Sequence, residues 1–307
     1  MKKEEFFESV KDEVEKLLPE EILREGKIKI LKAVKTNDLV LHGLTVERKT
    51  GLPSPVYYMD GFLNLYESGR TIPEIAEIFK VGFVEAWQSI PSAEFLYNLE
   101  YDYIKEKITF NIVDMDLNRE RLASLVYRPM DNGLAYVYYI EMNSEMKSPI
   151  TKALAKEQSY DLETLHNDAV NNTIRLYPPC LIDMTELINE VEGRLYSEEK
   201  NLLKEGNYSR NEYAMYLLIC KGGTAGPNAL FYPGVIERLD EFFGFDFYIL
   251  PSSMHEVILL SAKQYFTEDY LKEMVKEIND EFVNASEILS YKIFKYSYNE
   301  KKIISLW

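Results

Sequence analysis

The chain alternates between stretches with helical and with strand periodicity. Near the N-terminus, apolar residues recur at helical spacing among acidic ones, which predicts an amphipathic helix ending near Pro19: Phe6, Phe7, Val10, Val14, Leu17 and Leu18. The period then shortens toward two on either side of the turn sequence Thr36-Asn37-Asp38, so we expect a β-hairpin over residues 28–46. The alternation breaks at Gly43, which predicts a β-bulge there.

Strand and helix patterns continue to the end of the chain without a regular order. A capping box at Thr71 and Glu74 predicts a helix start, and Thr267 is expected to cap the last helix. Further helices are expected at 91–103, 118–125, 149–157, 161–176, 185–197 and 233–243, and strands at 56–59, 108–113, 136–140, 180–182, 213–220, 245–250, 257–260 and 288–298. We expect polar residues 198–211 to form a loop or a frayed helix.

The irregular order of elements favours an α+β fold, with mixed, largely antiparallel sheets packed with helices, over a doubly wound sheet. We place an N-terminal α+β lobe at residues 1–115 and a C-terminal α+β lobe at 116–307. No Gly/Ser/Pro linker marks this boundary, so one continuous domain is the alternative.

Composition is that of a globular protein, with 46% apolar and 28% charged residues among 307. The formal charge is −16, distributed along the whole chain rather than in one block, which argues against direct nucleic-acid binding and a polybasic membrane anchor. We find neither a signal-peptide pattern nor an apolar stretch of the roughly 20 residues that span a bilayer, and therefore expect a cytoplasmic protein.

Cysteine and histidine are too few and too scattered to predict a metal site or a cofactor. Cys180 and Cys220 both lie in apolar runs and are expected to be reduced core thiols. The three histidines, His42, His166 and His255, fall on different predicted elements without a local ligand pair.

His255 is the histidine with the most suggestive surroundings. It lies in Ser252-Ser253-Met254-His255-Glu256, at a predicted strand–turn–strand junction. Hydroxyl, imidazole and carboxylate groups together can catalyse acyl transfer. However, side chains of residues that are adjacent in one turn rarely converge into a catalytic triad. The alternative is that these side chains hydrogen-bond the turn itself. A catalytic role predicts His255 in a concave pocket beside a carboxylate or hydroxyl from a distant segment.

Three other features have ordinary structural explanations. The loop 222–228 follows a strand and precedes a helix, as phosphate-binding loops do, but it matches no phosphate-binding pattern and is expected to be a flexible connection. The 23 tyrosines include strand clusters that we expect to be half-buried sheet positions rather than a stacking platform. The acidic pairs Asp114/Asp116 and Asp161/Asp168 are expected to be solvated loop and helix-cap residues.

Several segments together resemble a bacterial family of unknown function, the DUF5688 type, and more distantly the DUF1444 type. The matching stretches include residues 35–37, 42–46, 54–60, 108–114 with Asn118, 127–129, 169–173, 248–258, 273–275 with Asn279, and 287–290. The chain has Gln158-Ser159 where the family pattern leads us to expect a tryptophan. The resemblance implies no established activity and therefore no catalytic residues.

These observations lead to three hypotheses about function. Because no complete catalytic motif is present, the first is a non-catalytic, intracellular protein-interaction or regulatory module with an unknown protein partner. The second is a hydrolase-like enzyme using His255, Glu256, Ser252 and Ser253, with Cys180 as a further neighbour. The third is an acidic mimic of nucleic acid, which requires acidic residues concentrated on one face.

Overall fold

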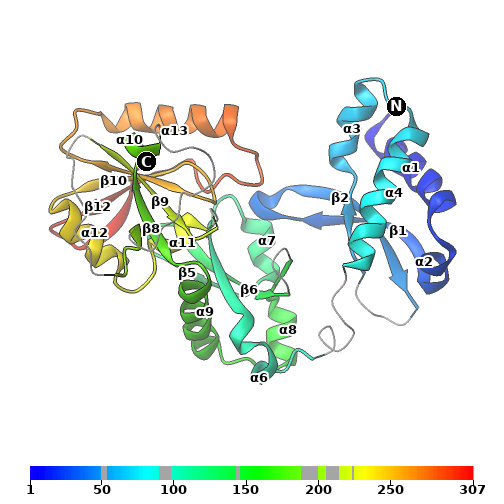
Figure 1. The fold of residues 1–307 in the computed structure, drawn as a ribbon, viewed down its shortest axis with the longest axis horizontal. Coiled ribbons are helices and arrows are strands. Elements are labelled where there is room, and N and C mark those ends of the chain that lie inside the picture. The colour runs from blue at the N-terminus through cyan, green and yellow to red at the C-terminus, as the bar shows by residue number, and fades with distance from the viewer. Residues whose placement is uncertain are drawn as a thin grey trace. The chain divides into compact units, whose positions relative to one another are not determined.

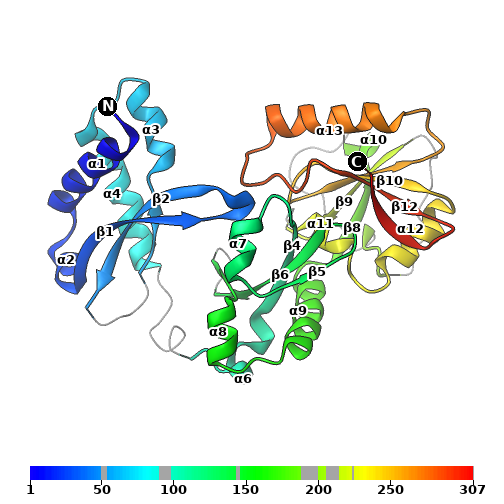
Figure 2. The same cartoon turned by 180° about the vertical axis from the view of Figure 1, so that it is seen from behind.

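A computed structural model describes residues 1–49, 54–89, 98–142, 146–187, 200–204, 214–222 and 225–306 of the chain (Figures 1 and 2). The chain forms two compact units: the first comprises residues 1–35 and 39–99, and the second comprises residues 36–38 and 100–307. The expected α+β class is confirmed, because the strands form separate antiparallel sheets packed with helices.

The first unit packs helices against a three-stranded sheet of order β1-β2-β3. Its elements are α1 (Lys3–Leu17), α2 (Glu20–Glu25), β1 (Gly26–Val34), β2 (Val40–Arg48), β3 (Tyr57–Tyr58), α3 (Asp60–Glu67) and α4 (Ile72–Gln88). The predicted N-terminal helix and hairpin are confirmed. The apolar stripe of α1 is buried together with that of α4, in a cluster that includes Phe6, Phe7, Phe79 and Phe83.

The predicted bulge at Gly43 is wrong. The register of β1 and β2 is regular throughout, with Gly43 opposite Leu31. The glycine is needed for close approach instead, because a Cβ atom there would lie 2.4 Å from Val56 Cγ1. Residues 42–46 of β2 are all buried, so both faces of the strand are covered near this position, and the polar–apolar alternation is lost without any extra residue.

The second unit contains two antiparallel sheets. In the smaller one, β4 (Ile108–Asp114) pairs with β6 (Leu134–Glu141), and the other edge of β6 carries both β5 (Tyr127–Pro129) and β7 (Lys147–Pro149). The helical segments around it are η1 (Thr36–Asp38), α6 (Tyr101–Ile104), η2 (Lys105–Lys107), α7 (Arg119–Ser124), α8 (Lys152–Glu157) and α9 (Leu162–Leu176). The helix expected at 149–157 starts later because residues 147–149 pair with β6.

The larger sheet has the strand order β13-β12-β10-β11-β9-β8. The strands are β8 (Pro179–Asp183), β9 (Met215–Cys220), β10 (Phe247–Pro251), β11 (Val257–Ser261), β12 (Ile293–Ser297) and β13 (Lys302–Leu306), and the helices are α10 (Met184–Leu187), α11 (Gly226–Ala229), α12 (Val235–Phe243) and α13 (Glu268–Phe282). The single strand expected at 288–298 is shorter and begins at Ile293. Parts of the predicted segments 91–103, 185–197 and 198–211 lie outside the described residues.

Alternating residues of β10 give the larger sheet two buried faces. Tyr248 and Leu250 pack with Leu271 of α13, whereas the ring of Phe247 stacks 4.5 Å from that of Phe243 in α12. Figure 1 shows α13 and α12 on different sides of this sheet. Because helices cover both faces near β10, the loops at the strand ends are more accessible than these faces.

No helix in the described part of the chain has the length and apolar character needed to cross a membrane. The lobes predicted at residues 1–115 and 116–307 stay a prediction. The compact units themselves divide between Leu99 and Glu100.

Candidate functional site

The turn that carries His255 connects β10 to β11. The strands pair up to Pro251 and Val257, and the backbone N–H of Ser253 donates to Glu256 O at 3.3 Å. The serine hydroxyls bond inside the turn: Ser252 Oγ donates to Glu256 Oε1 at 3.2 Å, and Ser253 Oγ accepts from the His255 N–H at 3.0 Å. Ser252, Ser253 and Glu256 thus hold the shape of the turn.

The imidazole of His255 meets a carboxylate from a distant segment. His255 Nε2 lies 3.6 Å from Glu287 Oε1, and the two side chains are 44% and 49% exposed. The backbone fixes their approach, because the N–H of Met254 donates to Glu287 O at 2.7 Å. Glu287 lies between α13 and β12, far from the turn in sequence.

A cavity of about 430 Å³ opens beside this pair. It lies within the second unit and is lined by strands of the smaller sheet and by loops next to the strands of the larger one. Its lining residues are Asn111, Glu141, Met146, Lys147, Tyr177, Gly222, Ala225, Met254, His255 and Glu287. Within the part of the chain that the structure describes, neither Ser252 nor Ser253 lines the cavity.

A second group of polar side chains lines the same cavity, around Glu141. Glu141 Oε1 accepts hydrogen bonds from the hydroxyls of Thr109 at 2.8 Å and Tyr177 at 3.3 Å. Lys147 Nζ lies 3.9 Å from the same oxygen and 3.5 Å from Asn111 Oδ1. The cavity therefore presents an amine, a phenol and an amide beside one carboxylate.

Burial changes the protonation of two of these groups. It lowers the pKa of Lys147, an effect that the nearby Glu141 carboxylate opposes. Burial also raises the pKa of Tyr177 to about 12, and Glu141 acts in the same direction. At neutral pH Tyr177 is therefore a hydrogen-bond donor, whereas Lys147 is more easily deprotonated than a surface lysine.

Residues 225–228 pack directly behind the His255 turn. The N–H of Gly226 donates to His255 O at 2.8 Å. A Cβ atom on Gly226 would lie 2.5 Å from His255 O and 2.6 Å from Leu218 O, so only glycine fits. Asn228 in α11 bonds two β4 backbone groups, Phe110 O at 2.8 Å and the Ile112 N–H at 2.9 Å. The described part of the predicted loop is thus a packed connection between the two sheets.

The other predicted candidates lie elsewhere. His42 pairs with Asp60 in the first unit at 3.2 Å, and His166 Nδ1 lies 2.9 Å from the hydroxyl of Tyr138. Cys180 and Cys220 are buried thiols, as expected. No group of three or more histidine, cysteine or acidic side chains in the described ranges is arranged to hold a metal ion.

The acidic pairs have different environments, and the expectation of solvation is wrong for Asp114. Asp161 does cap α9, accepting from Thr164 N at 2.8 Å. Asp114, however, is 2% exposed and lies 3.3 Å from Lys292 Nζ, which also contacts Asp116 Oδ2 at 2.7 Å. The carboxylate escapes solvent because Lys292, just before β12, supplies its counter-ion from a distant part of the chain.

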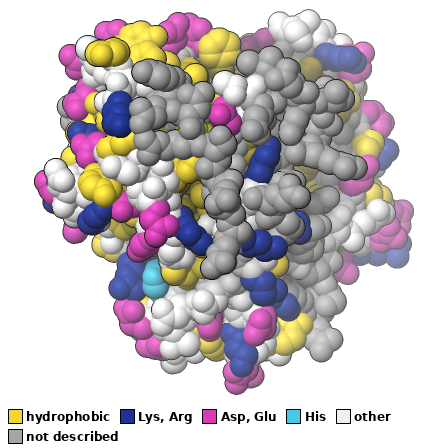
Figure 3. Space-filling model, turned by 60° about the vertical axis from the view of Figure 1, so that its left-hand side comes forward, with side chains coloured by type: hydrophobic (Ala, Val, Ile, Leu, Met, Phe, Trp, Pro, Cys, Tyr) yellow, Lys and Arg dark blue, Asp and Glu magenta, His cyan; other side chains and the backbone are white. Residues whose placement is uncertain are grey.

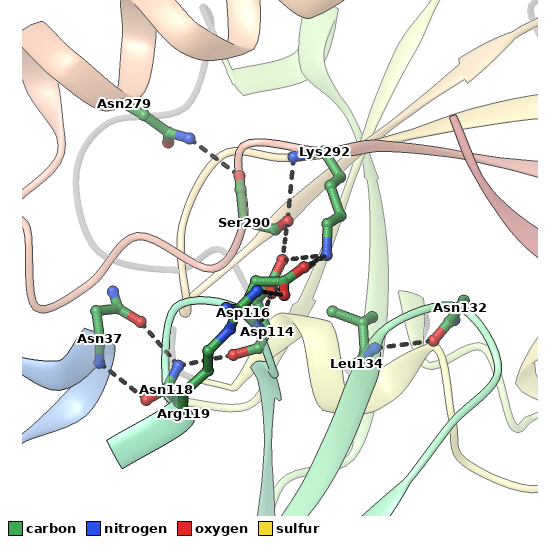
Figure 4. Close-up of polar contacts among 10 residues, drawn as sticks. All are labelled: Asn37, Asp114, Asp116, Asn118, Arg119, Asn132, Leu134, Asn279, Ser290 and Lys292. Carbon is green, nitrogen blue, oxygen red and sulfur yellow. Dashed lines mark hydrogen bonds and ion pairs between the residues drawn. The ribbon is translucent and has the colours of Figure 1, made fainter. Parts of the chain in front are cut away.

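The Asp114–Lys292 pair belongs to a polar network that joins segments far apart in sequence (Figure 4). Ser290 Oγ donates to Asp114, and Asn279 Nδ2 of α13 donates to Ser290 O at 3.0 Å. Asn118 Nδ2 donates to Asp114 O at 2.9 Å, while Asn118 Oδ1 accepts from the Asn37 N–H at 2.8 Å. Four of the stretches that carry the family resemblance meet in this network.

Sequence reasoning missed Lys147, Glu141, Tyr177 and Asn111. Glu141 and Lys147 pair across the β6–β7 ladder, so recognising that short hairpin would have placed them together. Nothing in the sequence indicated that Tyr177, which follows α9, would join them.

Comparison with known proteins identifies a family. The model of a family of unknown function, DUF5688, matches residues 3–298, which is nearly the whole chain. Neither the curated proteins nor the solved structures include a significant match. The more distant likeness to the DUF1444 type stays a prediction. The chain therefore belongs to the DUF5688 family of unknown function.

Proposed function

We propose that the cavity beside His255 is the active site of an enzyme that acts on a small polar substrate by general acid–base catalysis. The observation that carries the proposal is the pairing of His255 with Glu287 at a cavity that also holds Lys147. A carboxylate beside an imidazole orients the ring and stabilises its protonated form during proton transfer. The separation of 3.6 Å fits a pair that tightens when substrate binds.

Each polar group of the cavity has a role in this proposal. His255 transfers the proton and Glu287 positions its ring. The Tyr177 hydroxyl donates to Glu141 and offers its oxygen to substrate as a hydrogen-bond acceptor. Asn111 offers an amide, and Lys147 supplies an amine. The hydroxyls of Ser252 and Ser253 form hydrogen bonds within the turn. We therefore assign neither serine as a nucleophile, even if the enzyme is a hydrolase.

The three histidines provide a direct test of ligand binding. Protein labelled with ¹³C-histidine gives one ring ε1 signal per histidine, and a His255→Gln variant identifies the signal of His255. We expect at least one compound from a panel of amino acids, 2-oxo acids, sugar phosphates and nucleosides to shift that signal selectively. His42 and His166 are internal controls because neither lines the cavity.

Chromogenic esters, phosphates and glycosides test the catalytic part. We expect His255→Gln to reduce any turnover found by about 10²-fold or more, the usual contribution of a general acid or base. His166→Gln is the matched control and should retain activity. If no compound shifts the His255 signal and no substrate turns over, the proposed active site is wrong, and the protein-interaction hypothesis becomes the better one.

The charge distribution does not favour the nucleic-acid mimic. On the face drawn in Figure 3, lysine and arginine side chains lie among the acidic ones. The formal charge of −16 is also distributed along the sequence. Mixed-sign charge of this kind is typical of a solvated protein surface.

A further inference from the structure

We propose that Lys147 is a nucleophilic amine that captures the carbonyl carbon of a small aldehyde or ketone as an imine. This inference rests on the proposed active site and names its substrate class. Lys147 is the first residue of β7, and its side chain lines the cavity with Asn111 and Tyr177. A carbonyl compound in the cavity would therefore meet the amine.

The contacts of Lys147 leave its amine loosely held. The Tyr139 and Tyr177 ring centroids lie 5.5 Å and 6.0 Å from Nζ. Its polar contacts are long: 3.5 Å to Asn111 Oδ1 and 3.9 Å to Glu141 Oε1. That Glu141 oxygen already accepts two hydroxyl hydrogen bonds. The amine thus lies between aromatic rings without a close ion pair in the described structure.

Lys295 provides a contrast within the same unit. It lines a separate hollow of about 390 Å³, and its Nζ lies 2.7 Å from Asp246 Oδ2. The hydrogen bond to Asp246 raises the pKa of Lys295, whereas burial lowers the pKa of Lys147. The Lys147 side chain is 34% exposed, so a compound in the cavity can reach it. A lysine with a lowered pKa has more free amine at neutral pH, which is the form that attacks a carbonyl.

The proposed step is a condensation. The Nζ lone pair attacks the carbonyl carbon, a C–N bond forms, and the carbonyl π electrons pass to oxygen. Glu141, the nearest carboxylate, carries a proton from nitrogen to that oxygen and so gives a neutral carbinolamine. The nitrogen lone pair then forms the C=N bond while the C–O bond breaks, and the departing hydroxide takes the last N–H proton. One imine and one water result, and neither oxidant nor reductant is consumed.

Reductive trapping tests the proposal on the intact protein. Glyoxylate, pyruvate and dihydroxyacetone are added separately with sodium cyanoborohydride, which converts an imine to a stable secondary amine that peptide mass spectrometry can map. We expect at least one probe to modify Lys147 more than Lys295, whose amine is held 2.7 Å from Asp246 Oδ2. Lys147→Arg should remove the main adduct, and the matched Lys295→Arg variant should retain it. Circular dichroism checks that both variants fold.

Trace labelling with acetic anhydride at neutral pH measures the same nucleophilicity without a substrate. Lys147 should again react faster than Lys295. The proposal is overturned if Lys147 is no more reactive than Lys295, or if adducts are distributed evenly over the lysines. If a compound shifts the His255 signal but Lys147 remains unreactive, the imine is wrong while the proposed active site stands. If the whole panel leaves both residues unchanged, both proposals fail.

Discussion

Lys292 Nζ lies 3.3 Å from Asp114 Oδ2, and the two side chains are only 5% and 2% exposed. Ser290 Oγ and the Asp116 N–H also donate to the Asp114 carboxylate. Removing two charges from water costs several kcal/mol per ion, and their attraction repays this only while both partners are present. The pair therefore makes the packing of β12 against the end of β4 depend on each of the two residues.

We expect Lys292→Met to destabilise the second unit by about 3–5 kcal/mol, because the Asp114 charge would stay buried without its cation. Adding Asp114→Asn should recover part of the loss, since the amide carries no charge. Hydrogen exchange of β4 and β12 peptides measures the effect. The control is Lys301→Met at the more exposed Asp240 pair, for which we expect about 1 kcal/mol or less. Equal losses at the two pairs would contradict the prediction.

Asp116 should make the second unit sensitive to acid. Hydrogen bonds from Lys292 and Arg119 lower the pKa of Asp116 to about 2, below the ordinary value of about 3.9. A carboxyl group with a lowered folded-state pKa contributes stability above the unfolded pKa and loses that contribution as the pH falls through the folded value. We therefore expect stability to fall between about pH 4 and pH 2.

Urea unfolding followed by circular dichroism at pH 5 and at pH 2.5 checks this. Asp116→Asn should be less stable than the parent at the higher pH and should lose less on acidification. The difference should be modest, because Asp116 is 51% exposed and solvent screens its ion pairs. If the parent and the variant lose the same stability on acidification, other carboxylates are responsible for that loss.

Gly226→Ala should disturb the His255 turn. The new Cβ atom would meet His255 O and Leu218 O at 2.5–2.6 Å, and these are backbone atoms that cannot rotate away. Overpacking of this kind costs about 1–3 kcal/mol, and we also expect a shift of the His255 ring signal. Gly61→Ala is the control, because its Cβ atom would meet nothing within 4 Å and alanine favours the helix by about 0.5–1 kcal/mol. An unchanged His255 signal in Gly226→Ala would show that the turn does not depend on this contact.

Elements with their own period or cap could be predicted from the sequence, whereas the edge strands β5 and β7 could not. The apolar stripe of α1 and the capping box of α4 each specify an element locally. The three-residue strands β5 and β7 have too few residues to show a period, and each ends in proline. They are strands because the free edge of β6 is there to pair with them.

The candidate site could be predicted only in part, for the same reason. The turn around His255 is local, and its serine hydrogen bonds follow from the sequence. Glu287 becomes its neighbour because a backbone hydrogen bond joins Met254 to a loop beyond α13. Lys147 and Glu141 depend on strand pairing, and Tyr177 on where α9 ends. Such long-range relationships have no signature in one sequence.

Asn37 should position the segment that carries Glu287. Its side-chain Nδ2 donates to Ala285 O at 2.8 Å and to Ile288 O at 2.7 Å, on either side of Glu287. We expect Asn37→Ala to increase hydrogen exchange across residues 284–288 by about tenfold, as two hydrogen bonds of about 1 kcal/mol each are lost with partial compensation by water. The His255 ring signal should broaden or shift in the same variant.

Asn37→Gly separates this effect from backbone strain. Asn37 has φ 60°, a left-handed conformation that costs alanine about 1–2 kcal/mol and glycine almost nothing. If the side-chain hydrogen bonds hold the Glu287 segment, the glycine variant should show the faster exchange as well. If the glycine variant exchanges like the parent while alanine does not, the strained backbone is responsible, and the Glu287 loop keeps its position without Asn37. Residues 36–38, which lie between β1 and β2, belong to the second unit. The comparison of the two variants therefore also tests whether these three residues control the geometry of the His255–Glu287 pair.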